Sequence, residues 1–174
     1  LAPMALDQWV PFWPATVWLY ALQYVLLVWT FFGLRDRARL WRWLAAILVC
    51  QLVAALVFVL WPIEFPRSQW PLPAQTAPTV VAAVTWLRSI DAPTNCLPSL
   101  HVVSALLCLA MFDRAPLRRW RWLATVMAIL TIASTLTLKQ HFAIDLPAGA
   151  VLAALAWWGL LRERTPGFSL RSAN

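Results

Sequence analysis

The sequence predicts an all-α fold, a polytopic bundle of transmembrane helices. Of its 174 residues, 62% are hydrophobic and 12% are charged, whereas soluble domains average roughly half apolar and a quarter charged residues. Several apolar runs approach the ~20 residues that a helix needs to cross a bilayer. These runs are rich in Leu and Ala and lack the alternation of a transmembrane strand, which excludes a β-barrel.

Five runs predict spanning helices, at residues 14–33, 40–61, 97–113, 120–138 and 144–162. The third run is short and becomes adequate only if its helix begins near Asn95 or Cys96. We interpret residues 1–174 as one domain, because this length suits a single compact unit. The chain begins with Leu1 and shows no signal-peptide pattern. We therefore expect that a first helix is missing and that the full-length protein has six.

A long segment, residues 62–96, separates the second and third predicted spans. The stretch "WPIEFPRSQWPLPAQTAP" is interrupted by prolines, which excludes a continuous helix. The stretch "TVVAAVTWLRSI", residues 79–90, predicts a short helix that lies on the surface or dips between the others.

The positive charges predict the orientation of the bundle. Three regions, the two short loops and the chain after the last span, carry eleven of the fourteen Lys and Arg residues: Arg35, Arg37, Arg39, Arg42, Arg114, Arg118, Arg119, Arg121, Arg162, Arg164 and Arg171. Five alternating spans place these regions on one side, which the positive-inside rule assigns to the cytoplasm. Arg67, Arg88 and Lys139 fall on the outer side. Membrane topology thus accounts for the net charge of +7, and we expect no nucleic-acid partner.

The three cysteines show no metal-ligand spacing. Cys50 and Cys108 lie inside apolar runs, and Cys96 lies just before one. We expect all three to pack as small apolar side chains, and the sequence gives no basis for assigning a disulfide.

Chemically active side chains gather at the outer ends of the predicted spans. The chain has two histidines, and both lie there. The outer side brings together these candidate site residues: Arg67, Ser99, His101, Lys139, His141 and Asp145. Ionisable groups at membrane depth are costly, so they indicate a functional site. We expect them to converge on one pocket.

This set of side chains suits phosphoryl transfer. Arg and Lys neutralise phosphate oxygens, and "PSLH" at residues 98–101 offers a hydroxyl and backbone N–H groups at a helix start. The spacing of His141 and Asp145 predicts that both lie on one face of a helix, where the carboxylate orients the ring. His101 is then free to protonate the leaving oxygen.

Each residue also has an ordinary structural interpretation. Lys139 suits a side chain that reaches the membrane interface, Arg67 suits a loop charge, and either Ser99 or Asp145 suits a helix cap. The two histidines suit interfacial positions. The coincidence of all these groups on a side with three positive residues favours the functional interpretation.

Two of these stretches resemble a known family, the type-2 phosphatidic acid phosphatase superfamily. Its members carry the motifs K-x6-R-P, P-S-G-H and S-R-x5-H-x3-D. The stretch "PRS" supplies Arg67 for the first motif and "PSLH" matches the second. The stretch "STLTLKQHFAID" matches the third, from Ser134 through His141 to Asp145.

The sequence departs from the family pattern at four positions. Leu60 and Ser68 replace the lysine and proline of the first motif, and Leu100 replaces the glycine of the second. Thr135 stands where the third motif has arginine, and Lys139 is a candidate to substitute for that phosphate contact.

The resemblance implies an integral membrane lipid phosphatase or phosphotransferase without a metal or another cofactor. His141 would be the nucleophile that forms a phosphohistidine, Asp145 would orient it, and His101 would be the general acid. The phosphoryl group would be held by the remaining candidates: Arg67, Ser99, Leu100 and Lys139. The active site would face the extracytoplasmic side, and the substrate would be a phospholipid, sphingolipid or isoprenoid phosphate or pyrophosphate.

The forms "PSLH" and "KQH", with "LDQWVPFWPATVWLY" near the start, are most similar to the inositolphosphotransferase-like branch, which includes inositol phosphorylceramide synthases. Such an enzyme would require an alcohol acceptor in place of water. Two interpretations from other classes remain. One is a haem protein with His101 and His141 as axial ligands, and the other is a non-catalytic structural or transport protein of the membrane.

Overall fold

The computed structural model describes residues 5–113 and 116–162. Within these ranges the regular elements are helices, and the β-pairing is limited to one isolated bridge between Ile63 and Asn95. The predicted all-α fold is therefore confirmed. Three arginines assigned above to the cytoplasmic side lie outside the described residues: Arg114, Arg164 and Arg171.

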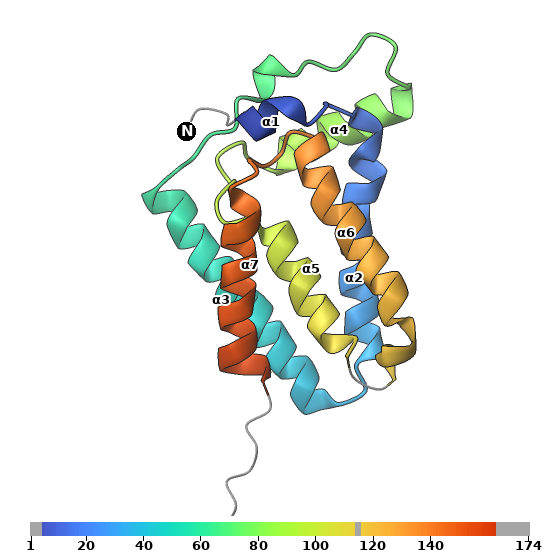
Figure 1. The fold of residues 1–174 in the computed structure, drawn as a ribbon, viewed down its shortest axis with the longest axis vertical. Coiled ribbons are helices and arrows are strands. Elements are labelled where there is room, and N and C mark those ends of the chain that lie inside the picture. The colour runs from blue at the N-terminus through green and yellow to red at the C-terminus, as the bar shows by residue number, and fades with distance from the viewer. Residues whose placement is uncertain (1–4, 114–115, 163–174) are drawn as a thin grey trace, which may run out of the picture.

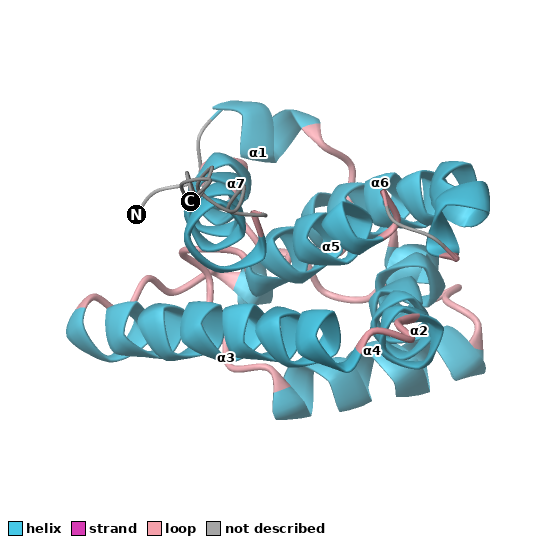
Figure 2. Ribbon diagram, turned by 90° about the horizontal axis from the view of Figure 1, so that it is seen from below, coloured by secondary structure: helices cyan, strands magenta, loops and turns pink. Residues whose placement is uncertain are grey.

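The elements follow the chain in this order: α1 (Ala5–Trp9), η1 (Pro14–Thr16), α2 (Val17–Gly33), α3 (Arg37–Leu60), η2 (Arg67–Gln69), α4 (Pro78–Ile90), α5 (Leu100–Met111), η3 (Leu117–Trp120), α6 (Arg121–Thr137), α7 (Asp145–Ala156) and η4 (Trp157–Leu161). Helices α2, α3, α5, α6 and α7 run side by side, and α1, α4 and the longer loops lie across one end of this bundle (Figure 1). Seen along the bundle, α5 lies inside the ring formed by the other long helices (Figure 2).

In the described part of the chain, three helical segments are long and apolar enough to cross a membrane: Pro14–Gly33, Arg37–Leu60 and Leu117–Thr137. The other two predicted spans form shorter apolar helices, Leu100–Met111 and Asp145–Leu161. At 12 residues, α5 is about 18 Å long. It packs against α2, α3, α6 and α7, so its neighbours rather than lipid surround it.

The condition under which the third run would be long enough to span, a helix that begins near Asn95 or Cys96, is not met. Asn95 forms the bridge with Ile63, and the Cys96 thiol donates to the carbonyl oxygen of Pro93 at 3.1 Å. The bridge holds Asn95 against Ile63 at the start of the outer segment, the thiol contact closes a local turn, and the helix begins at Leu100, after Pro98.

A side-chain cap explains where α3 begins. The Asp36 carboxylate accepts hydrogen bonds from the N–H groups of Ala38 and Arg39, so α3 begins at Arg37, earlier than its apolar run.

The turn between α2 and α3 lies at the end of the bundle opposite α1 and α4 (Figure 1). The arginine-rich α2–α3 and α5–α6 connections therefore share one end, as predicted from the alternation of spans.

The predicted surface helix is confirmed as α4. Its buried residues, Val80, Val84 and Leu87, form a stripe at helical spacing that packs against Tyr20 of α2 and Leu138. This packing fixes the end of α4, where Asp91 follows, against the outer end of α2.

A glycine allows α7 to approach the start of α5. A Cβ at Gly149 would lie 2.5 Å from the carbonyl oxygen of Ser99, closer than two such atoms can approach. The N–H of Ser99 donates to the carbonyl oxygen of Asp145 at 3.2 Å. Close packing thus brings the first turns of α5 and α7 together.

Candidate active site

His141 lies in the loop between α6 and α7, and not on a helix as its spacing with Asp145 predicts. Asp145 is the first residue of α7. The two side chains nevertheless meet, because the loop folds back over the start of α7: Nδ1 of His141 lies 3.3 Å from Oδ2 of Asp145. The pairing was thus predicted for the wrong geometric reason.

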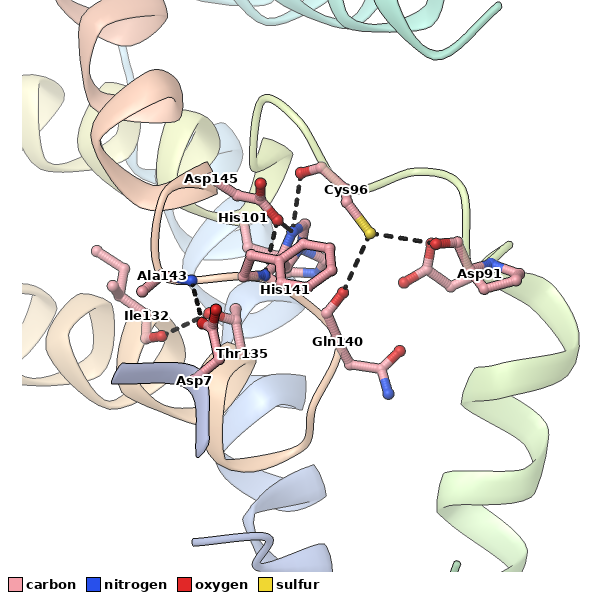
Figure 3. A network of polar contacts seen from close by, with 12 residues as sticks. Asp7, Asp91, Cys96, His101, Ile132, Thr135, Gln140, His141, Ala143 and Asp145 are labelled. Carbon is pink, nitrogen blue, oxygen red and sulfur yellow. Dashed lines mark hydrogen bonds and ion pairs between the residues drawn. The ribbon is translucent and has the colours of Figure 1, made fainter. Parts of the chain in front are cut away.

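Two acceptors face the same ring nitrogen of His141 (Figure 3). Besides the Asp145 carboxylate, the carbonyl oxygen of Cys96 lies 2.9 Å from Nδ1. Since both oxygens accept, Nδ1 carries the proton and Nε2 keeps a free lone pair. Oδ2 of Asp145 also accepts from the N–H of Phe142 at 2.8 Å, which holds the loop and the ring together.

His101 lies in the first turn of α5 and faces His141. The ring centroids are 5.6 Å apart, with planes at 65°. The hydroxyl of Tyr20 lies 3.4 Å from Nδ1 of His101 and 3.4 Å from Oδ2 of Asp91. The Tyr20 hydroxyl can donate its proton to the Asp91 carboxylate. It then accepts from Nδ1 of His101 when the imidazole is protonated at that nitrogen.

Arg67 begins η2 and reaches Asp91 from the outer loop. Its Nη1 donates to the Asp91 carbonyl oxygen at 2.6 Å, and Nη2 lies 3.6 Å from Oδ2 of Asp91. The side chain is 10% exposed, and Nε and Nη2 have no hydrogen-bond partner among the described residues. Arg67 is therefore joined to His101 through Asp91 and Tyr20.

Ser99 and Leu100 form the start of α5. Ser99 is fully buried, and its Oγ lacks a hydrogen-bond partner within the described part of the chain. Leu100 is the first residue of the helix, and the N–H groups of a first turn have no carbonyl partner within the helix. These groups suit an anion at the helix start.

Lys139 makes its contacts with the N-terminal segment of the chain. The residue has a positive φ of 56°, and 1% of its side chain is exposed. Its Nζ donates to the carbonyl oxygens of Asp7 and Val10, and it lies 5.1 Å from the centroid of the Trp70 ring. Burial lowers the pKa of this amine, and Asp7 opposes that shift. The contacts of Lys139 are thus not those expected of a residue that reaches for phosphate.

The N-terminal segment is joined to the His141 loop a second time. Oδ1 of Asp7 accepts a hydrogen bond from the N–H of Ala143 at 2.7 Å (Figure 3). Asp7 is buried, with 3% of its side chain exposed. The segment that contains α1 is therefore held over the loop that carries His141.

Sequence reasoning missed Tyr20, Asp91 and Asp7. One signal was present: the predicted outer side carries few acidic residues, and Asp7 and Asp91 are two of them. The contact with the Cys96 carbonyl left no signal, because any residue has that group.

The prediction that the cysteines are packing residues is confirmed, because all three side chains are buried. Burial, together with the nearby Asp145, raises the pKa of the Cys96 thiol to about 12. Within the described ranges, no group of three or more His, Cys, Asp and Glu side chains is arranged to hold a metal ion.

The family model of the PAP2 superfamily matches residues 7–159 of the chain. No curated protein and no solved structure gives a significant match. The matched region covers most of the chain and contains all the site residues described above. The chain therefore belongs to the PAP2 superfamily, the type-2 phosphatidic acid phosphatases, and is an integral membrane protein of phosphatase type.

Proposed function

We propose that this protein cleaves a lipid phosphate or pyrophosphate through a phosphohistidine on His141. The observation that carries the proposal is the environment of Nδ1 of His141, which faces the Cys96 carbonyl and the Asp145 carboxylate. This environment leaves Nε2 unprotonated, and the carboxylate stabilises the ring as positive charge develops. Asp145 is fully buried, so solvent does not screen this interaction.

The reaction is divided between the two histidines. Nε2 of His141 forms a bond to phosphorus while the bond from phosphorus to the lipid oxygen breaks. The electron pair of that bond goes to the leaving oxygen, which takes a proton from His101. In the second half, His101 accepts a proton from water as the water oxygen attacks phosphorus, and His141 is released with inorganic phosphate.

Three groups are proposed to bind the phosphoryl oxygens. Arg67 supplies Nε and Nη2, Ser99 supplies its hydroxyl, and Leu100 supplies a backbone N–H. The lack of hydrogen-bond partners for the buried side-chain atoms of Arg67 and Ser99 supports this role, because buried polar atoms are normally paired. We propose that Lys139 acts as a positioning residue for the His141 loop, because its amine bonds the N-terminal segment.

In a phosphatase water attacks the phosphohistidine, and in a headgroup phosphotransferase an alcohol attacks it. The first half-reaction is the same in both, so the proposal covers both outcomes, including transfer of the inositolphosphotransferase type. The contacts of Tyr20 and Asp145 with the histidines favour phosphoryl transfer over the haem alternative, which needs neither.

We propose that the active site faces the extracytoplasmic side. The site lies at the end of the bundle that carries α1 and α4, opposite the arginine-rich α2–α3 connection. The positive-inside rule assigns that connection to the cytoplasm.

The experiment measures phosphate release from a panel of lipid phosphates and pyrophosphates by detergent-purified protein, with a chelator present. Addition of inositol or glycerol then shows whether an alcohol replaces water as the acceptor. Release should be lost in His141→Ala and His101→Ala. The control is Thr30→Val, which alters a buried hydroxyl that bonds the Leu26 carbonyl within α2. Turnover by His141→Ala equal to that of the unaltered protein would exclude the proposed nucleophile.

A further inference from the structure

A second group of polar side chains lies one helical turn deeper in the bundle than the histidines. A pocket of about 150 Å³ lies between α2 and α3, with α5 as its floor. His101 and Leu100 line its outer part, and Gln23, Ser104 and Gln51 also line it. Gln23 follows Tyr20 by three positions on α2, and Ser104 follows His101 by three on α5, so their contact lies about 5 Å below the Tyr20–His101 contact.

The hydrogen bonds fix the orientation of the Gln23 amide. The hydroxyl of Ser104 donates to the carbonyl oxygen of Leu100 at 2.6 Å. Ser104 Oγ must therefore accept from Gln23, whose Nε2 lies 2.8 Å away. The other amide atom, Oε1 of Gln23, has no hydrogen-bond partner in the described residues. The residue is nevertheless buried, with an exposed fraction of only 3%.

The pocket opens toward the lipid-facing side of the bundle. Tyr24 lines the pocket and is 50% exposed. Gln51 also lines it and is exposed on α3, where residues 43–60 contain no other amide and no charged side chain. Polar groups at this depth are costly and indicate a ligand with polar atoms.

We propose that this pocket holds the lipid end of the substrate and selects lipids with a hydrogen-bond donor next to the phosphoester carbon. This inference rests on the proposed function, in which His101 protonates the leaving oxygen. The leaving alcohol then begins beside His101, and its next carbon lies near the depth of Gln23. A hydroxyl or amide N–H on that carbon donates to Oε1 of Gln23.

Two lipid classes carry such a donor and two do not. N-acyl sphingoid 1-phosphates have an amide N–H at this position, and 1-acylglycerol 3-phosphates have a hydroxyl. Diacylglycerol phosphates and isoprenoid phosphates have neither. A lipid without the donor leaves the buried amide oxygen unpaired, and a site of this kind discriminates strongly against a ligand that lacks the matching group.

The test compares kcat/KM for the N-acyl sphingoid, 1-acylglycerol and diacylglycerol phosphates in mixed micelles, with matched acyl chains. The two donor lipids should exceed the diacyl lipid by about tenfold or more. In Gln23→Met this preference should fall to about one, because the amide oxygen that distinguishes the donor lipids from the diacyl lipid is removed. Thr30→Val is the control on the same helix. If one donor lipid alone is preferred, that result identifies the source of the donor.

The outcomes separate this inference from the proposed function. Release that needs His141 but shows equal kcat/KM for all three lipids, or an unchanged preference in Gln23→Met, would overturn the inference and leave the proposed function intact. If no lipid is cleaved, the proposed function fails, and a lipid-binding measurement then tests the inference. In His141→Ala, an N-acyl sphingoid should displace a fluorescent lipid at lower concentration than a diacylglycerol does. The added Gln23→Met substitution should abolish that difference, and equal displacement in His141→Ala would overturn the inference.

Discussion

Oδ2 of Asp145 lies 3.3 Å from Nδ1 of His141, although the two residues do not share a helix. The same oxygen accepts the N–H of Phe142 at 2.8 Å. One carboxylate oxygen therefore orients the ring and fixes the loop that carries it.

Asp145→Asn should lower kcat by about 10²- to 10⁴-fold, because an amide does not stabilise the imidazolium that forms during transfer. KM for the lipid phosphate should change little, since Asp145 is not proposed to bind the phosphoryl group. Steady-state kinetics check both values, and a thermal unfolding curve checks the fold. A kcat near that of the unaltered protein would refute the role of the pair.

Tyr20→Phe should lower kcat by about tenfold, because it removes the hydroxyl between Asp91 and His101. Asp91→Asn should also lower kcat. If the two residues act on His101 as a unit, the double variant should lose less than the product of the two single losses. A multiplicative loss would instead indicate that the two residues act separately.

Arg67→Ala should reduce kcat/KM by about 10²- to 10³-fold, the usual effect of removing one donor to a developing charge. The matched control is Arg88→Gln, at the same end of the bundle, whose guanidinium donates to the carbonyl oxygen of Trp70 at 3.3 Å. Inhibition by inorganic phosphate should weaken in Arg67→Ala and stay unchanged in Arg88→Gln. Equal effects of the two substitutions would mean that general positive charge, and not Arg67, binds the phosphate.

Lys139→Met tests whether this residue positions the loop or binds phosphate. It leaves the buried carbonyl oxygen of Asp7 and the partly buried one of Val10 without their donor, at a cost of about 1–3 kcal/mol. We expect a lower unfolding temperature, faster proteolysis near residues 7–13 and reduced kcat. A raised KM with unchanged stability would instead support the role predicted from the sequence, as a substitute for the arginine absent at Thr135.

The helical architecture could be predicted because a helix that crosses the bilayer needs a long apolar segment, and such segments are visible in the sequence. The beginning of α5 could not, since it depends on contacts of Asn95 with Ile63 and of Cys96 with Gln140, both far away in the sequence. The surface helix α4 was visible as an apolar stripe between proline-rich and polar stretches.

The candidate site was predictable in part for the same reason. Two histidines and an aspartate at the ends of apolar segments are conspicuous in the sequence. The structure brings these residues, His101, His141 and Asp145, together. Tyr20 was hidden within an apolar span, where an aromatic residue is ordinary. The contacts of Lys139 depend on the path of residues 7–10 across the end of the bundle, which no local pattern reveals.

The most direct test of the account is capture of the covalent intermediate. The purified protein is mixed with a lipid phosphate that it cleaves, quenched at alkaline pH to preserve a phosphohistidine, digested and analysed by mass spectrometry. One phosphate should appear on the peptide that contains His141, and none in His141→Ala. More phosphopeptide should accumulate in His101→Ala if the substitution slows water attack further than phosphoenzyme formation. Phosphate on His101 in place of His141 would contradict the central claim, as would undiminished turnover in His141→Ala.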